Sequence, residues 1–267
     1  MNAAPAPPTI VFLPGLANDA EVWADLRAEL RRLAPPMLAP LLDAAVVSDV
    51  HSRHATLPEM ARTLLAECAG PLVLVGHSMG GMVAQHVVRQ APARIAALAL
   101  LSTTARPDTP EMIRLRSDAC ALFAAGGADE VLRANVAFAF HADNAAADKA
   151  MVARYFAIVM RAGAAQLIAQ NHAVMARDDG RPYLAAIDTR NCPTFVLCGE
   201  ADALTPPELA REITAAVPGA RLELLPRCGH MLTLEQPAAV AARLADWLAD
   251  ALAAGLWQSR APAAGAR

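Results

Sequence analysis

Short apolar runs alternate with stretches of helical spacing through the first hundred residues. Thr9–Leu13, Leu72–Val75 and Ile95–Leu101 are mostly apolar runs with the length of buried strands. Between them, Glu21–Leu33 and Leu57–Ala69 carry apolar residues three or four positions apart, which is typical of amphipathic helices. Strands and helices that alternate at this spacing predict βαβ units and therefore a parallel sheet.

The alternation includes one weaker run early in the chain and returns near its C-terminal end. We interpret Met37–Leu42, which follows two prolines, as a further short strand. We expect the residues after Gly255 to form a frayed tail. The late elements are predicted as a strand at Pro193–Cys198, a helix at Pro206–Val217 capped by Thr205, a strand at Arg221–Leu225 and a helix at Pro237–Leu252.

The middle of the chain, from Pro107 to about Asn191, lacks strand-like runs and contains only helical patterns. An all-helical block inside an α/β pattern is typical of an inserted cap. We therefore predict a core of residues 1–106 and 191–267 with a helical cap over residues 107–190. The cap should cover the C-terminal edge of the sheet, where open parallel sheets bind ligands. Its predicted helices are Glu111–Ala124, Asp129–Phe140, Ala145–Arg161, Ala164–Arg177 and the short Arg181–Ile187.

One motif stands directly after a predicted strand and before a predicted helix: Gly76-His77-Ser78-Met79-Gly80-Gly81. It matches the G-x-S-x-G pattern, in which a serine is held on a sharp strand-to-helix turn at the top of a parallel sheet. Gly76 and Gly80 flank Ser78 where side chains would crowd the turn. The motif predicts that Ser78 is a nucleophile.

A serine hydroxyl needs a general base, and the base needs an acid that orients it. Asp202 comes four residues after the predicted strand that ends at Cys198, and His230 lies in the loop after Arg221–Leu225. The chain order serine, aspartate, histidine is the order expected for this arrangement. Glu200, two residues from Asp202, is the alternative acid.

With these motifs the sequence resembles the α/β-hydrolase-fold serine hydrolases over nearly its whole length. It is most similar to capped carboxylesterases, enol-lactonases and pimeloyl-carrier-protein methyl-ester esterases. The resemblance implies that Ser78 is the nucleophile, His230 the base and Asp202 the acid. It also implies an oxyanion hole made of the backbone N–H groups of Leu16 and Met79. The matching segments are Leu13-Pro14-Gly15-Leu16, residues 76–81, Leu197-Cys198-Gly199-Glu200-Ala201-Asp202 and Cys228-Gly229-His230.

The sequence departs from that family in three places. Many relatives have His-Gly after the first core strand, where this chain has Pro14-Gly15. Only about eight residues precede Thr9, too few for the usual first hairpin, so we expect a sheet of about six strands, all parallel. The loop that usually follows the next strand is replaced by Asp43–Thr56.

Composition and charge exclude several other classes. The chain has 267 residues, of which 55% are hydrophobic, and a net charge of −3 gives no reason to expect nucleic acid or an anionic membrane as partner. We find no segment typical of a membrane span and no secretory signal in Met1–Pro8. The five cysteines contain no C-x-x-C pair, which favours free thiols in a reducing cytoplasm. His51 and His54 form an H-x-x-H pair, which we interpret as surface histidines; we expect no metal and no organic cofactor.

The resemblance predicts a hydrolase that cleaves a small carboxylic ester, lactone or related acyl compound through an acyl-enzyme. Two alternatives remain: a carbon–carbon bond hydrolase of a vinylogous diketone, and a non-enzymatic small-molecule receptor on the same scaffold. Phe138, Phe140 and Met231 are candidate substrate contacts, although aromatics at this spacing in a cap more often form the cap's own core. We expect a monomer or a homodimer.

Overall fold

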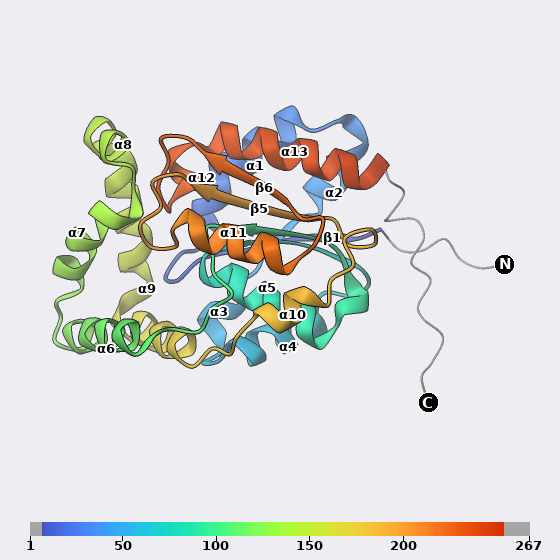
Figure 1. The fold of residues 1–267 in the computed structure, drawn as a ribbon. Helices are drawn as coiled ribbons and strands as arrows, with labels where there is room; N and C mark the ends of the chain where they lie inside the picture. Colours follow the sequence, from blue (N-terminus) through green and yellow to red (C-terminus); the bar gives the residue numbers. More distant parts are fainter. Residues whose placement is uncertain (1–6, 254–267) are drawn as a thin grey trace.

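A computed structural model describes residues 7–253 of the chain. Six strands form one sheet in the order β2-β1-β3-β4-β5-β6, and every neighbouring pair is parallel, which confirms the predicted sheet (Figure 1). The predictions for the first six residues and for the tail after Gly255 lie outside the described residues. The strands are β1 (Thr9–Leu13), β2 (Val46–Val47), β3 (Leu72–His77), β4 (Ile95–Leu101), β5 (Thr194–Gly199) and β6 (Arg221–Leu225).

Helices cover both faces of this sheet (Figure 1). α1 (Ala24–Leu33) and α13 (Pro237–Ala253) pack together on one face. α4 (Leu57–Glu67), α5 (Met79–Gln90) and α11 (Pro207–Ala216) lie on the other. Short helices connect these elements: η1 (Ala20–Trp23), α3 (Val50–Arg53), η3 (Pro92–Arg94) and α12 (Leu232–Glu235).

The central strand β3 is buried on both faces, which explains why its sequence is a continuous apolar run. Val73 and Val75 belong to the core cluster with α1 and α13. Leu72 and Leu74, which alternate with them, belong to the cluster with α4, α5 and α11. The period of two along the strand thus builds two cores from one run.

The predicted strand at Met37–Leu42 is wrong. The segment forms two short helices, η2 (Pro36–Leu38) and α2 (Ala39–Asp43), and the strand beside β1 is only the two residues of β2. Pro40 explains the difference. A proline cannot donate to a sheet ladder, but it is tolerated in the first turn of a helix, where its missing N–H has no partner.

Five helices stand between β4 and β5, as the predicted fold with an inserted helical cap requires. Figure 1 shows α6, α7, α8 and α9 grouped beyond one end of the sheet. The last of the five, α10, packs instead against α5 and α11 of the core. The domain boundaries at residues 107 and 190 stay a prediction. The helices are α6 (Pro110–Ala124), α7 (Ala128–Ala139), α8 (Ala142–Ala147), α9 (Lys149–Met175) and α10 (Arg181–Ala185).

Among residues 7–253, α9 alone is long and apolar enough to cross a membrane by length and composition. Gly163 interrupts it with a φ of 77° and a ψ of 163°, values that no helix allows. The two parts on either side of Gly163 are each shorter than the roughly 20 residues that a membrane span needs. The break therefore argues against a single straight span.

The order of the strands determines where a site can form. The chain steps from β1 outward to β2 and then returns to β3 on the other side of β1. The loops that follow β1 and β3 therefore leave the sheet in different directions. A crevice opens at such a switch point at the carboxyl ends of the strands, and open α/β sheets bind ligands there.

Candidate active site

Ser78 stands at the turn between β3 and α5 with a φ of 52° and a ψ of −119°. Such values are rare for a residue with a side chain. Small neighbours make the turn possible: a Cβ on Gly76 would lie 2.6 Å from the carbonyl oxygen of Gly80, and one on Gly80 would lie 2.0 Å from that of Leu13. The N–H of Ser78 donates to the carbonyl of Leu101 at 2.9 Å, which anchors the turn on β4.

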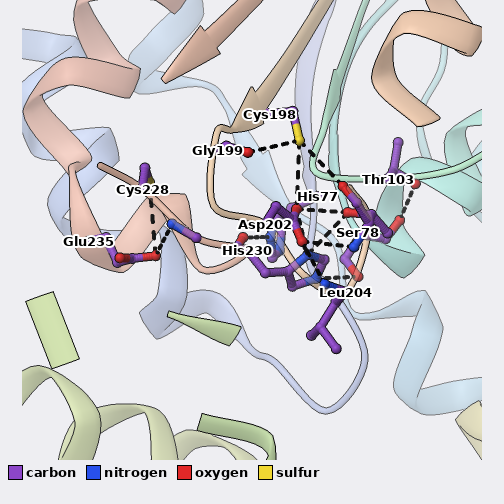
Figure 2. A network of polar contacts seen from close by, with 12 residues as sticks. His77, Ser78, Thr103, Cys198, Gly199, Asp202, Leu204, Cys228, His230 and Glu235 are labelled. Carbon is purple, nitrogen blue, oxygen red and sulfur yellow. Dashed lines mark hydrogen bonds and ion pairs between the residues drawn. The ribbon is translucent and has the colours of Figure 1, made fainter. Parts of the chain in front are cut away.

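Three predicted residues from three different loops meet at this edge of the sheet (Figure 2). Nε2 of His230, in the loop after β6, lies 2.9 Å from Oγ of Ser78. Nδ1 of His230 lies 3.0 Å from Oδ2 of Asp202, which follows β5. The alternative acid, Glu200, is exposed. Geometry alone thus distinguishes the two carboxylates.

The surroundings of Asp202 hold its carboxylate ionised. Its Oδ1 accepts the N–H groups of Leu204 and Thr205 at 3.0 and 2.8 Å, and its Oδ2 accepts the Thr205 hydroxyl at 2.8 Å. Burial opposes ionisation, but the charge and hydrogen bond of His230 together with the Thr205 bonds lower the pKa of Asp202 to about 2. An ionised carboxylate can only accept hydrogen bonds, so Nδ1 of His230 carries the proton and donates it to Asp202. The lone pair of Nε2 therefore faces Ser78.

The role predicted for Thr205 as a helix cap is wrong. α11 begins at Pro207, its N-cap is Pro206, and no side chain caps it. The Thr205 hydroxyl is directed to Asp202 instead. A threonine before a helical run satisfies the sequence rule for a cap, in which its Oγ would accept an N–H of the first helical turn. Here the Thr205 hydroxyl donates to a buried, ionised carboxylate, which is a strong acceptor.

His77 is completely buried under the site. Its Nε2 lies 2.9 Å from the carbonyl oxygen of His230, so Nε2 carries the proton and donates it. Burial, reinforced by the neighbouring His230, lowers the pKa of His77 to about 3. His77 is therefore a neutral side chain that holds the backbone of His230.

The two predicted oxyanion donors come from two different segments, the loop after β1 and the start of α5. Met79 is the first residue of α5, so its N–H has no helical acceptor. Within residues 7–253 no acceptor pairs with the N–H of Leu16, which lies in the loop after β1. Gly15, which this chain shares with the family's His-Gly, lets this loop lie close to the turn, because a Cβ on Gly15 would lie 3.2 Å from Cβ of Ser78.

The candidate substrate contacts differ in their surroundings, and their binding role stays a prediction. Phe138, on α7, is 53% exposed. Phe140 is buried, and its ring lies edge-on to that of Tyr155 with centroids 5.2 Å apart. Met231 is also buried, and its N–H donates to the carbonyl of Ala139 at 2.9 Å. The loop of His230 and the end of α7 therefore lie side by side.

Glu235 joins these two segments and was not singled out from the sequence. Its Oε1 accepts the N–H of Gly229 at 2.8 Å, and its Oε2 accepts the N–H of His141 at 2.9 Å. One carboxylate thus accepts hydrogen bonds from the loop of His230 and from the helical insertion. In the sequence, the feature that could have pointed to Glu235 is its position five residues after His230.

The interpretation of His51 as a surface residue is wrong. His51 lies buried on α3, with Nε2 2.7 Å from the carbonyl oxygen of Asn18. His54 instead contacts the hydroxyl of Thr63 at 2.9 Å. The two histidines therefore have separate partners. Over the described part of the chain, no group of three or more metal-ligating side chains gathers.

The fold is that of an α/β hydrolase. The model of the alpha/beta hydrolase family matches residues 10–243. The chain belongs to this family, and it is a hydrolase.

Two curated relatives align over nearly the full chain. A putative carbamate hydrolase RutD of Pseudomonas savastanoi is 27% identical over 90% of this chain and 93% of its own length. A pimeloyl-[acyl-carrier protein] methyl ester esterase of Aromatoleum aromaticum is 27% identical over 90% of this chain and 97% of its own length.

Solved structures share the fold. A thermophilic esterase from Thermogutta terrifontis superposes with a TM-score of 0.78 at 24% identity and covers 93% of this chain and 92% of its own. The enol-lactonase from Burkholderia xenovorans LB400 superposes with a TM-score of 0.76 at 22% identity, over 91% of this chain and 92% of its own.

Proposed function

We propose that this hydrolase cleaves a small carboxylic ester, lactone or related acyl compound through an acyl-enzyme on Ser78. The observation that carries the proposal is the continuous hydrogen-bonded chain from Oγ of Ser78 through both nitrogens of His230 to Asp202. A serine, a neutral imidazole and an ionised carboxylate in this order are what nucleophilic acyl transfer needs.

The proposed reaction begins when Nε2 of His230 takes the proton of Ser78 as Oγ attacks the carbonyl carbon. Asp202 stabilises the imidazolium that forms. The N–H groups of Leu16 and Met79 then bind the oxyanion, and each such donor typically supplies about 3 kcal/mol of transition-state stabilisation. The imidazolium returns the proton to the leaving alcohol. Water, deprotonated by the same Nε2, then attacks the acyl carbon. The bond from that carbon to Oγ of Ser78 breaks, the imidazolium returns the proton to Oγ, and the acid is released.

The relatives support the chemical class of the substrate. A carbamate and a methyl ester, named for the two curated relatives, both present a carbonyl carbon that bears a heteroatom leaving group. An ester or lactone fits the same description. The cysteines add support for the predicted cytoplasmic setting, because Cys68, Cys120, Cys198 and Cys228 are free thiols, as reducing compartments maintain.

A serine-directed fluorophosphonate tests the nucleophile. We expect a single label on Ser78, located by mass spectrometry, and turnover of a chromogenic short-chain ester. Ser78→Ala should lose both. Ser117→Ala, which alters a serine on α6 of the insertion, is the matched control and should keep both. A label on another residue, or full labelling of Ser78→Ala, would contradict the proposal.

A further inference from the structure

The loop after β1 contains a strained residue next to one of the proposed oxyanion donors. Ala17 is buried and has a φ of 56°, a left-handed conformation that costs a residue with a side chain about 1–2 kcal/mol. Such a conformation persists only where the surroundings fix it. The groups that hold Ala17 matter for the site because its neighbour Leu16 has an N–H that pairs with no acceptor among the described residues.

The group that holds Ala17 comes from the helical insertion. Oε1 of Gln170, on the second part of α9, accepts the N–H of Ala17 at 2.6 Å. Nε2 of the same carboxamide donates to the carbonyl of His51 at 2.9 Å. Gln170 is 1% exposed, so water cannot replace either bond without opening the structure.

His51 completes the contact from the other side. Its Nε2 donates to the carbonyl of Asn18 at 2.7 Å, because a carbonyl can only accept. Burial lowers the pKa of His51, which favours the neutral ring that this bond uses. Gln170 and His51, which are also bonded to each other, thus hold the loop at Ala17 and at Asn18.

We propose that Gln170 is a positioning residue for the oxyanion hole, through which the helical insertion sets the orientation of the Leu16 N–H. The inference rests on the proposed function. The peptide unit is planar, so fixing the N–H of Ala17 also fixes the carbonyl of Leu16 and restricts the rotation of that residue. Because the Ala17 N–H is occupied by Gln170, the Leu16 N–H is the donor that remains for substrate.

A consequence is that the hole has its full geometry only while α9 is docked against this loop. Loss of the carboxamide should weaken the binding of the oxyanion more than the binding of the uncharged ester. Misplacement of one donor by a fraction of an ångström to 1 Å is expected to lower kcat about 10- to 100-fold.

The test replaces Gln170 by methionine, which has similar size and no hydrogen-bonding amide. We expect Gln170→Met to lower kcat by about 10- to 100-fold and leave KM within about threefold. The Ki of an alkyl trifluoromethyl ketone, which forms a tetrahedral adduct with the serine, should rise by the same factor as kcat falls. Concentrations of active enzyme are set by fluorophosphonate titration, so that a smaller folded fraction does not count as lower kcat.

Gln85→Met is the matched control. Gln85 is equally buried, and its Nε2 donates to the carbonyl of Thr104 at 3.0 Å, away from the loop after β1. We expect Gln85→Met to lower the free energy of unfolding about as much as Gln170→Met does, and to leave kcat and Ki unchanged. Should Gln170→Met not fold, Gln170→Asn carries the same expectations, because its shorter carboxamide cannot span both partners.

An unchanged kcat or an unchanged Ki in the Gln170 variant overturns the proposal, as does an equal loss in Gln85→Met. The proposed function fails in a different way. In that case the wild-type enzyme itself shows no label on Ser78.

Discussion

Asp108 and Arg177 form a buried ion pair that joins the start of α6 to the end of α9 in the helical insertion. Oδ1 of Asp108, just before α6, lies 2.7 Å from Nη2 of Arg177, just after α9, and the two side chains are 0% and 4% exposed. Nε of Arg177 also donates to the carbonyl of Arg106 at 2.8 Å. Arg116, on α6, contacts the other oxygen of Asp108 at 2.8 Å. Charged side chains therefore hold the start of α6 against the end of α9.

Removal of one partner of this pair should destabilise the protein strongly, because it leaves a buried charge with less compensation. We expect Arg177→Met to lower the free energy of unfolding by about 3 kcal/mol, since Arg116 still faces Asp108. Arg133→Met, which breaks an exposed pair with Asp129 on α7, should lower it by less than about 1 kcal/mol. Urea denaturation measures both; equal losses would show that burial of the Asp108 pair has no energetic consequence.

The sequence predicted those parts of the site that depend on local pattern. The place of Ser78 on a strand-to-helix turn was predictable because the strand, the two glycines and the helix are contiguous in the chain. The places of Asp202 and His230 at the same edge were predictable because each closely follows a recognisable strand. Parallel strands bring such loops to one edge, so the meeting of the three residues follows from the topology.

What the sequence did not predict depends on contacts between distant residues. Gln170 meets Ala17 across 153 positions, and nothing in the helical pattern of α9 distinguishes it from a surface glutamine. The burial of His51 has the same origin, since its partner Asn18 lies in another loop. The wrong strand at Met37–Leu42 has a different cause. Pro40 is visible in the sequence, and a proline there already argued against a strand.

The choice of the acid can be tested by a pair of isosteric variants. Asp202→Asn should keep the fold but lower kcat by about 10³- to 10⁴-fold, because an amide facing Nδ1 favours the wrong tautomer of His230. Glu200→Gln is the control, and its exposed side chain should leave kcat nearly unchanged. Steady-state kinetics on a chromogenic ester compares them; a larger loss in Glu200→Gln would reverse the assignment.

The buried His77 should make the protein less stable in mild acid. Its pKa is about 3 in the folded protein and 6.5 in an unfolded chain, so below pH 6.5 the unfolded chain takes up a proton that the folded protein refuses. Stability is thus lost as pH falls from about 6.5 toward 3, and this group alone accounts for about 2 kcal/mol between pH 7 and pH 5.

His77→Gln removes this titration and keeps a donor toward the carbonyl of His230. We expect the free energy of unfolding of the variant to fall about 2 kcal/mol less than that of the wild type between pH 7 and pH 5. His51 and His86 also have pKa values lowered by burial, but they are present in both proteins and cancel in the difference. Urea denaturation measures the free energy of unfolding of both proteins at each pH. If it fell by the same amount in both, His77 would not be the source of the acid sensitivity.

The two cap phenylalanines should separate stability from substrate preference. Phe140 is buried against Tyr155, so Phe140→Ala should lower the free energy of unfolding by about 3–5 kcal/mol. Phe138 is 53% exposed, and Phe138→Ala should change the free energy of unfolding by less than about 0.5 kcal/mol.

Phe138→Ala is therefore the variant that tests substrate contact in an intact fold. If its ring touches the acyl group, kcat/KM across a series of acyl chain lengths should shift unevenly, by about tenfold or more for the chains that reach it. A common factor for all chain lengths, or no change, would mean that Phe138 does not contact the acyl chain.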